Sequence, residues 1–402
     1  MHTDILIVGA GLAGLFTARE LLKKRPGTKV VLFEKYKQVG GRVLTYYKEE
    51  HQWEIGAGRI SSQHTKVLSL LKEYNLQTVP IGPEIIYRED GDAPYEKNEF
   101  EDAIDVLLKP LAALSPSVLG NHTLKELLTQ IHGADAVKEW MNRFPYHSEM
   151  VTLRADMGLL SFLGEMKTHS GYFVCKEGLS ALANELAADI LKRGGEFYLD
   201  QELVSVKRGM AIFKSGVKVK AETIVLALPI SALKKLPLFD GWSIGSHVIM
   251  KPLMRIYATF PLQEGKSWFH GLPRVVTTNP IRYFLPTSAE QGDAMVSYTD
   301  AVFTKRYMDA KEEGQKELEK AVMDDLRRLF PERAIPNPTF LRAYPWKNGV
   351  SYWLPGSYSP SVDSEKAVNP FPGIYVCNES FSMRQGWMEG ALEHAELLLK
   401  KL

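Results

Sequence analysis

The sequence predicts an α/β fold, and three observations predict it. An apolar strand pattern from Ile5 to Val8 runs directly into closely spaced glycines and then into a helical pattern. Two later stretches, 223–227 and 373–379, have the apolar composition of buried strands. A helical pattern over 176–192 precedes the first of them. Strands that alternate with helices in this way are typical of a parallel sheet covered by helices.

The first strand ends in a glycine motif with the spacing G-x-G-x-x-G. It consists of Gly9, Gly11 and Gly14, with Leu12 and Ala13 between the last two. Gly9 permits the tight turn out of the strand, Gly11 lets backbone N–H groups approach a phosphate, and Gly14 lets the helix pack close to the sheet. The N-terminus of the following helix attracts anions. We therefore predict a Rossmann-like unit that holds the pyrophosphate of a dinucleotide.

A second strand over Val30–Phe33 ends in Glu34, which is followed by Lys35. Glu34 lies 20 residues after Gly14, where a carboxylate can accept hydrogen bonds from both hydroxyls of an adenosine ribose. A phosphorylated ribose would be repelled by this acid. The motif therefore favours FAD or NAD over NADP.

The bulk properties favour a small-molecule enzyme. A chain of 402 residues has room for two or three domains, and its net charge of +1 gives no reason to expect nucleic acid or a membrane as partner. Cys175 and Cys377 have neither disulfide-framework nor zinc-site spacing, so we expect no metal and a reducing, cytoplasmic location. The longest uncharged apolar run, 223–233, is too short to cross a membrane, and we expect no signal peptide before the first strand.

Two further glycine-rich stretches follow the second strand. They are 40–42, with the sequence Gly-Gly-Arg, and 56–59, with the sequence Gly-Ala-Gly-Arg. Glycines allow the backbone to approach a ligand closely, and the arginine of the first stretch supplies a fork of donors for a phosphate or a cofactor carbonyl. Both stretches are therefore candidate cofactor loops.

In this order, the glycine motif, Glu34 and the two later glycine-rich stretches resemble the FAD-binding half of the flavin amine oxidase superfamily, which includes monoamine, polyamine and L-amino-acid oxidases. The resemblance implies a GR2-type flavoprotein fold, in which a Rossmann-like FAD-binding domain carries an inserted mixed-sheet substrate domain and a helical subdomain. No cysteine stands near Val350, where some monoamine oxidases attach the flavin, so FAD is expected to be bound non-covalently. The residues implied to contact it are Gly9, Gly11, Leu12, Ala13, Gly14, Glu34, Lys35, Gly41, Arg42, Gly56, Ala57, Gly58, Arg59, Val204, Asn378, Glu379, Gly386, Trp387 and Met388.

The expected domains are discontinuous in the chain. Apolar residues at helical spacing fill 99–162, which predicts an inserted group of helices that would cover a cofactor or substrate entrance in this superfamily. The expected division is an FAD-binding domain at 1–62, 172–240 and 362–402, a substrate domain at 63–98 and 241–361, and a helical subdomain at 99–171.

Shorter patterns complete the expectation. The charged stretch 311–330 predicts one long helix with a solvated outer face, and 346–353 is expected as a loop leading back toward the flavin. A helix is expected at 64–76, and strands at 85–87, 196–199, 203–206, 217–220, 223–227, 250–260, 283–286 and 294–298.

The C-terminal section resembles the closing motif of the superfamily. A strand ends in Glu379, and Gly386-Trp387-Met388 opens the last helix. By resemblance, the acid contacts the ribityl-phosphate part of FAD and the helix N-terminus points at the flavin pyrimidine. The residue before the acid is Asn378, where the superfamily usually has glycine.

The resemblance also implies substrate-site residues. Trp387 matches an aromatic wall of the amine cage, with Tyr352 and Trp353 as candidates for the opposite wall. Arg59 matches the arginine with which L-amino-acid oxidases bind the substrate carboxylate, although a structural salt bridge is an alternative role. Arg255 stands where the superfamily usually has a lysine that holds a water at the flavin, and Lys251 lies too early in the strand. Arginine is bulkier and keeps its proton.

The expected reaction is FAD-dependent oxidation of a C–N bond of an amine or L-amino acid, which gives an imine and, with molecular oxygen as acceptor, hydrogen peroxide. The alternatives are a flavin-dependent desaturase or isomerase, a protoporphyrinogen-oxidase-like enzyme, and a flavin-binding protein with little oxidase turnover. A second copy of the chain, in a homodimer, is the one macromolecular partner expected.

Overall fold

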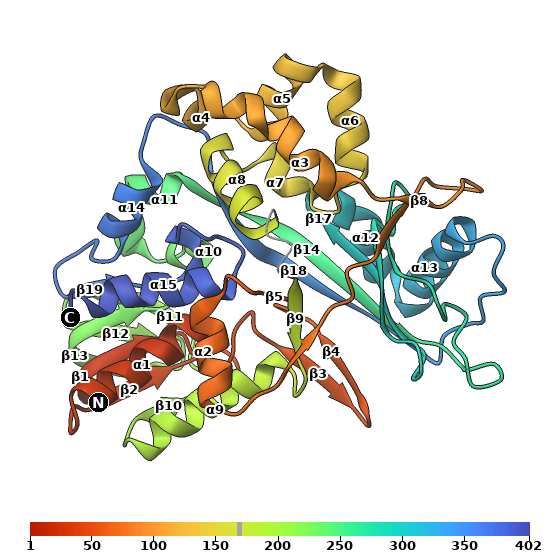
Figure 1. Ribbon diagram of the computed structural model, residues 1–402. Helices are drawn as coiled ribbons and strands as arrows, with labels where there is room; N and C mark the ends of the chain where they lie inside the picture. The colour runs from red at the N-terminus through yellow and green to blue at the C-terminus, as the bar shows by residue number, and fades with distance from the viewer. Residues whose placement is uncertain (167–170) are drawn as a thin grey trace.

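The structure, a computed structural model, describes residues 1–166 and 171–402. Residues 167–170, which fall in the expected helical subdomain, lie outside the described residues. Two seven-stranded sheets organise the molecule. In Figure 1 the first sheet lies at the lower left, the second crosses to the right, and helices α3 to α8 gather at the top. The expected α/β class is confirmed.

The first sheet has the strand order β10-β2-β1-β13-β12-β11, and β19 also pairs with β13. The strands β10, β2, β1, β13 and β19 run parallel to one another. Strand β12 pairs antiparallel with β13, and β11 pairs antiparallel with β12. Its strands are β1 (His2–Val8), β2 (Val30–Phe33), β10 (Glu196–Tyr198), β11 (Leu203–Lys207), β12 (Met210–Phe213), β13 (Lys218–Leu226) and β19 (Ile374–Val376).

Two strand predictions in this sheet were wrong. The stretches 217–220 and 223–227 are parts of the single strand β13, and β12 was not expected. The first half of β13 alternates exposed lysines with buried apolar residues because it pairs there with β12, whereas the second half is buried between β1 and β19. One strand therefore carries two sequence patterns.

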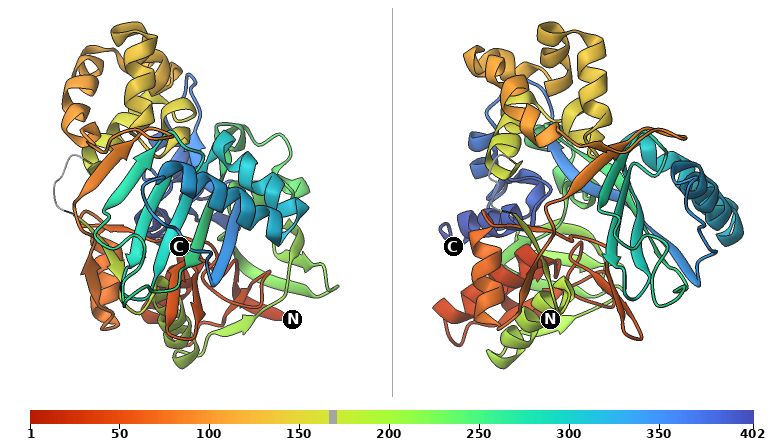
Figure 2. Two further views of the ribbon diagram at one scale, coloured as in Figure 1. Left: turned by 90° about the vertical axis from the view of Figure 1, so that its right-hand side faces the viewer. Right: turned by 45° about the vertical axis from the view of Figure 1, so that its right-hand side comes forward.

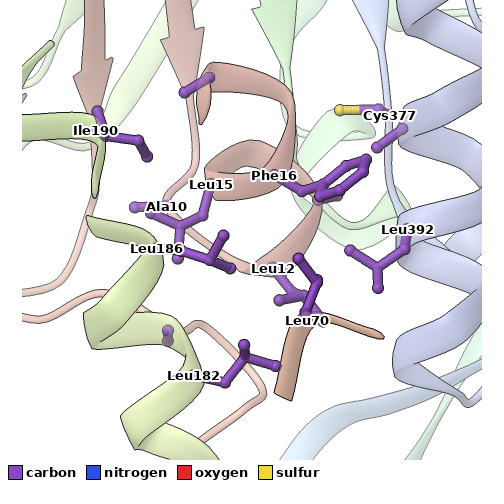
Figure 3. Packing of buried hydrophobic residues seen from close by; sticks show 14 of the residues in the cluster. Ala10, Leu12, Leu15, Phe16, Leu70, Leu182, Leu186, Ile190, Cys377 and Leu392 are labelled. Atoms are coloured by element: carbon purple, nitrogen blue, oxygen red, sulfur yellow. The ribbon is translucent and has the colours of Figure 1, made fainter. Parts of the chain in front are cut away.

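Helices cover the first sheet and bury a common core. Helix α1 packs against α9 and α15, and α15 also contacts α2. Figure 3 shows Leu15 and Phe16 of α1 meeting Leu186 of α9 and Leu392 of α15, all of them buried. The helices of this region are α1 (Leu12–Lys24), α2 (Thr65–Glu73), α9 (Leu179–Lys192), α10 (Ile230–Leu233), α11 (Ser243–Ser246), α14 (Pro360–Ala367) and α15 (Met388–Leu399).

The second sheet has the order β18-β14-β17-β16-β15-β7-β8. The expected loop at 346–353 is wrong, because these residues belong to β18, which pairs with β14. A register shift opposite Lys251 and Leu253 absorbs the extra residues of β18, and the Leu253 side chain fills the space beside Gly349. The strands are β7 (Ile85–Arg88), β8 (Glu96–Lys97), β14 (Val248–Thr259), β15 (Arg274–Thr277), β16 (Tyr283–Ser288), β17 (Asp293–Asp300) and β18 (Phe340–Trp353).

The expected helix at 311–330 is two helices, α12 (Lys305–Glu313) and α13 (Gln315–Leu329). The chain breaks at Gly314, whose φ of 148° lies outside the helical region. The outer face of α13 is charged, but its inner face buries Leu318, Val322 and Leu326 in the core of the second sheet. Figure 2 shows both helices against one face of that sheet.

The helical group has a core of its own, built around Phe100, Trp140, Phe144 and Phe162. These separate cores support the three domains, whose boundaries we propose as given above. Among the described residues, no helix is long and apolar enough to cross a membrane. The helices are α3 (Phe100–Leu108), α4 (Pro116–Asn121), α5 (Leu124–His132), α6 (Ala134–Asn142), α7 (His147–Val151) and α8 (Ala155–Ser161). Two small sheets join the parts, β3 (Thr45–Lys48) with β4 (His51–Glu54), and β9 (Tyr172–Cys175) between β5 (Ile60–Ser61) and β6 (Thr78–Pro80).

Candidate active site

The glycine motif forms a turn between β1 and α1. Gly9 has a φ of 103°, and a Cβ at Gly14 would overlap the carbonyl oxygen of Gly9. At Gly11 the nearest atom to an added Cβ is the carbonyl oxygen of Gly40, 3.9 Å away, so space remains in front of the helix N-terminus. The first turn of α1 carries no acidic side chain that could neutralise this end. The loop therefore fits an anionic ligand such as the pyrophosphate of FAD.

Glu34 ends β2 beside this loop. Its carboxylate accepts hydrogen bonds from the backbone N–H of Ala10 at 2.7 Å and of Tyr36 at 2.9 Å, which fixes the side chain at the strand end. Lys35 forms an ion pair with Glu202 at 2.8 Å, so its side chain turns toward the segment that leads into β11. Val204 follows in β11 with an exposed side chain. These placements are compatible with the proposed adenosine end of the site.

Arg42 and Glu379 join three segments at the centre of the molecule. The Arg42 guanidinium lies 2.8 Å from a carboxylate oxygen of Glu379 and donates to the carbonyl of Gly349 at 3.0 Å. The same carboxylate accepts from the N–H of Gly386 at 2.7 Å and from the hydroxyl of Ser351 at 3.1 Å. This ion pair, in which Glu379 is buried and Arg42 is partly exposed, holds the Gly-Gly-Arg loop, β18 and the start of α15 together.

Asn378 replaces the expected glycine for a visible reason. Its side-chain nitrogen donates to the carbonyl of Leu228 at 2.7 Å, and its side-chain oxygen accepts from the N–H of Phe381 at 3.2 Å. It thereby caps the short helix Glu379–Phe381 and ties it to the end of the first sheet. Met388, in the first turn of α15, is buried in the core below.

The second glycine-rich loop is held at its backbone. Ala57 donates its N–H to the carbonyl of Arg42 at 2.9 Å, and a Cβ at Gly56 would overlap that carbonyl. A Cβ at Gly58 would collide with the guanidinium of Arg255. The loop therefore passes between the Gly-Gly-Arg segment and the second sheet, and the fixed backbone beside it requires glycine at position 56.

Arg59 lies in a cage of aromatic rings. Its guanidinium carbon is 4.8 Å from the ring centroid of Tyr172, 5.0 Å from that of Tyr146 and 5.7 Å from that of Trp387. The rings of Tyr172 and Trp387 are nearly parallel, with an interplanar angle of 9°. Among the described residues, no carboxylate forms an ion pair with Arg59. The structural salt bridge considered as an alternative is therefore not formed there.

Sequence reasoning missed the tyrosines of this cage. Tyr172 begins β9, which pairs with β5 directly after Arg59, and Tyr146 precedes α7 of the helical group. Tyr298 of β17 meets Tyr146 edge to face at 5.3 Å. Nothing in the local sequence of any of them marks a site, since tyrosine is common in strands and helix boundaries.

The two expected opposite-wall residues have different surroundings. Trp353 is fully buried in a core cluster of the first sheet that also includes Tyr352, and its ring nitrogen donates to the carbonyl of Ser382 at 3.0 Å. Its place in the cage wall stays a prediction. A strand alternates its faces, and Tyr352 therefore points the other way. Burial raises the pKa of Tyr352 well above its ordinary value, and Glu149 and Tyr298 are among its electrostatic neighbours. Tyr352 is kept as a candidate.

Arg255 is committed to the backbone below the cage. It donates to the carbonyl of Glu54 at 2.8 Å, as does the hydroxyl of Tyr257 at 2.7 Å, and its guanidinium lies over the ring of Tyr298 at 5.4 Å. Burial raises the pKa of the Glu54 carboxyl to about 7, against hydrogen bonds that act in the opposite direction. Arg255 therefore has a positioning contact in addition to any contact with a ligand.

Lys251 lies four residues before Arg255 in β14, on the other side of the register shift. It is the register partner of Val350. A Cβ added at Gly386 would lie 3.2 Å from Cγ1 of Val350, which is the nearest atom to it. Partners in adjacent strands point to the same side of a sheet. Lys251 therefore lies on the same side of the sheet as Val350, whose side chain is near Gly386.

A family model described as flavin containing amine oxidoreductase matches residues 12–397. The chain belongs to this family. This flavin-dependent amine oxidoreductase therefore uses FAD, and the family favours C–N oxidation over the desaturase and porphyrinogen alternatives. The glycine loops, Glu34 and the space at Gly11 fit the adenine and pyrophosphate end of that cofactor.

Individual relatives are more distant. Aplysianin-A of Aplysia kurodai is 22% identical and is covered over 89% of its length by 99% of this chain. An L-amino-acid oxidase of Demansia vestigiata is 37% identical over 48% of this chain, and one of Mus musculus is 24% identical over 53%; the matches span 35% and 36% of those proteins. The structure of wild-type putrescine oxidase bound to putrescine superposes on the whole chain with a TM-score of 0.76 and 17% identity, and covers the same fold over 99% of its length.

Proposed function

We propose that this amine oxidoreductase oxidises L-amino acids, or amines of similar size that carry a carboxylate beside the reacting carbon. The observation that carries the proposal is Arg59, a cation inside an aromatic cage that pairs with no carboxylate among the described residues. A buried charge without a partner is costly, and a bidentate carboxylate on the substrate would offset that cost. The amino-acid oxidase relatives support the same substrate class.

The residues have distinct tasks in this reaction. When bound, FAD would supply the acceptor for a hydride from the carbon that bears the neutral amine, so that the substrate becomes a protonated imine. Arg59 binds the carboxylate and so fixes which C–H bond faces the cofactor, while the rings of Tyr172 and Trp387 exclude water from the reacting carbon. The carbonyl of Gly386 is the proposed acceptor for the amine N–H. The Glu379 carboxylate holds Gly386 in place through its N–H.

The same cage disfavours simple diamines. A cationic amine is attracted by aromatic rings, but here the guanidinium of Arg59 already lies against three of them. A second cation would meet repulsion at close range with little water to screen it. We therefore propose that this chain differs from the putrescine-bound neighbour in substrate charge.

The test uses Arg59→Met and Arg59→Lys on the FAD-loaded protein. With Arg59→Met, kcat/KM for L-amino acids should fall by on the order of 1,000-fold, since a charge-assisted bidentate contact is lost, while decarboxylated amines of the same side chain should be unaffected or improve. Arg59→Lys should retain part of the activity because a single charge remains. Equal losses for both substrate classes, or no oxidation of any L-amino acid by the wild type, would contradict the proposal.

Three finer features are also proposed. Molecular oxygen is the proposed acceptor, which hydrogen peroxide release would test. Non-covalent FAD should be released when the protein is denatured by acid. A cytoplasmic location is proposed because both cysteines are free and buried. A homodimer is also proposed, and light scattering would give the mass of the particle in solution.

A further inference from the structure

A small cavity of about 40 Å³ lies beside the cage, where the helical group meets the second sheet. Arg59, Tyr146 and Tyr172 of the cage line it, and so do Arg274 and Arg143. Its remaining lining is mainly apolar or aromatic, from Ile85, Phe100, Phe144, Pro145 and Tyr283 together with Asn98. The cavity therefore combines an apolar wall with three cations.

The three arginines differ in their partners. Arg143 is neutralised twice, by Glu96 at 2.7 Å and by Glu139 at 3.0 Å. Arg274 donates only to uncharged acceptors, which are the carbonyl of Pro83 at 2.9 Å, the carbonyl of Glu84 at 3.3 Å and the hydroxyl of Tyr283 at 3.3 Å. No carboxylate of the described residues pairs with it. Arg274 and Arg59 thus bring two uncompensated charges to one cavity.

Tyr283 connects these two charges. Its hydroxyl accepts from Arg274, and Tyr283 is also an electrostatic neighbour of Arg59. Asn98, the polar residue that could compete for a ligand, is already engaged: its side-chain nitrogen donates to the carbonyl of Arg143 and its oxygen accepts from the N–H of Phe100. Besides Arg59, Arg274 is therefore the polar group of the cavity that is placed to meet an anion.

The size of the cavity agrees with a small anionic group. At roughly 10–15 Å³ for each water, 40 Å³ holds about three waters, which is also the number of heavy atoms in a carboxylate. An acidic group placed there would lie against the aromatic lining and beside Arg274, whereas an uncharged polar group would leave Arg274 without a counter-charge.

We propose that Arg274 forms a second anion subsite, so that the preferred substrates are amino acids with an acidic side chain. This inference rests on the proposed function: Arg59 binds the carboxylate next to the reacting carbon, and the side-chain carboxylate enters the cavity and binds Arg274. Arg274 is then a specificity-determining residue. It takes no part in the oxidation itself.

The experiment compares L-glutamate with L-glutamine, which has the same shape and no charge. In the wild-type holoenzyme, kcat/KM should be at least tenfold higher for L-glutamate. Arg274→Gln should remove this preference by lowering kcat/KM for L-glutamate, while kcat/KM for L-glutamine should stay within about threefold of the wild-type value. Arg274→Lys should restore part of the preference because it returns the charge. Equal losses for both substrates in Arg274→Gln would mean that Arg274 acts only on general attraction or on folding, and would overturn the proposal.

A control and a binding measurement separate this inference from the proposed function. Arg342→Gln removes an exposed arginine of the same sheet that stacks on Tyr46 and Tyr344. This control should leave kcat/KM unchanged for both L-glutamate and L-glutamine. Glutarate and butyrate are then titrated against the flavin absorption spectrum. If the wild type oxidises no L-amino acid, the proposed function fails, but the second subsite can still be tested by binding. The wild type should then bind glutarate more tightly than butyrate, and Arg274→Gln should abolish this difference; equal binding of the two acids by the wild type would overturn the inference. If L-amino acids are oxidised without preference for L-glutamate, the second subsite alone is wrong.

Discussion

The adenosine end and the amine end of this site are built in different ways. The adenosine end is made by β1, α1 and β2, which are consecutive in the chain, and it uses backbone atoms and missing side chains. The amine end is made by side chains from β9, the segment before α7, β17 and the start of α15, which are far apart in sequence. The first is therefore a local motif, and the second is a product of tertiary packing.

Because the two ends are built differently, substitutions in them should have different effects. A backbone site tolerates almost no added atoms, because a single Cβ meets fixed carbonyls. A side-chain site depends on charge and orientation, so its failures appear first in specificity and in pH dependence. Substitutions at the two ends should then separate loss of fold from loss of selectivity.

The largest effect is expected from alanine at two neighbouring glycines. Gly14→Ala should lower the free energy of unfolding by about 3 kcal/mol, because its Cβ would overlap the carbonyl of Gly9. Gly11→Ala should leave the apoprotein stable, since Gly11 has extended backbone angles and an open side, yet weaken FAD binding at least tenfold by entering the phosphate space. Urea unfolding of the apoprotein and fluorescence titration with FAD measure both. Unchanged FAD affinity in Gly11→Ala would move the pyrophosphate away from this loop.

The ion pair between the two ends should show the next largest effect. Arg42→Met leaves the buried carboxylate of Glu379 without its cation and should cost about 3 kcal/mol of stability. Adding Glu379→Gln to that variant should recover part of the loss, because the uncompensated charge is removed. Chemical unfolding of both variants provides the comparison. A double variant no more stable than Arg42→Met would show that packing, and not charge, holds this junction.

Glu54 predicts a pH effect beneath the amine end. Burial raises the pKa of its carboxyl from 4.5 to about 7, so the folded protein binds this proton more tightly than the unfolded chain does. The free energy of unfolding contributed by this carboxyl therefore falls as pH rises from about 4.5 to 7, by about 3 kcal/mol, and the penalty is complete above pH 7. Glu54→Gln should remove this pH dependence of the free energy of unfolding, and at pH 8 the variant should be more stable relative to the wild type than it is at pH 4.5. Parallel stability curves for the two proteins would contradict this assignment.

The smallest expected effect concerns Arg255 and Lys251, the two cations of β14. Arg255→Lys should raise the rate of flavin reoxidation by oxygen about threefold, because a lysine is smaller and can give up its proton. Lys251→Met is the matched variant on the same strand face. If reoxidation responds to Lys251→Met and not to Arg255→Lys, Lys251 fills the role expected for Arg255. Stopped-flow absorbance of the reduced protein separates these outcomes.

Much of the architecture could be predicted because its signals are local. The glycine motif, the helix after it and Glu34 lie within one short stretch, and the second strand was placed at its observed bounds. The strand β18 could not be predicted from 346–353, because glycine and lysine in that stretch resemble a loop and only pairing with β14 makes it a strand. The same limit applies to Trp353, whose direction depends on the register of that strand.

The sequence by itself determined the dinucleotide-binding unit and the kinds of residue that can meet an amine or a carboxylate. Glycine spacing and a strand-terminal acid act through backbone geometry, which a short stretch specifies almost alone. Only the tertiary structure decided that Arg59 lies among Tyr146, Tyr172 and Trp387 without a carboxylate partner, and that Arg255 is held by the carbonyl of Glu54. The physical reason is that the charge balance of a buried group depends on every chain segment packed around it, and those segments come from opposite ends of the sequence.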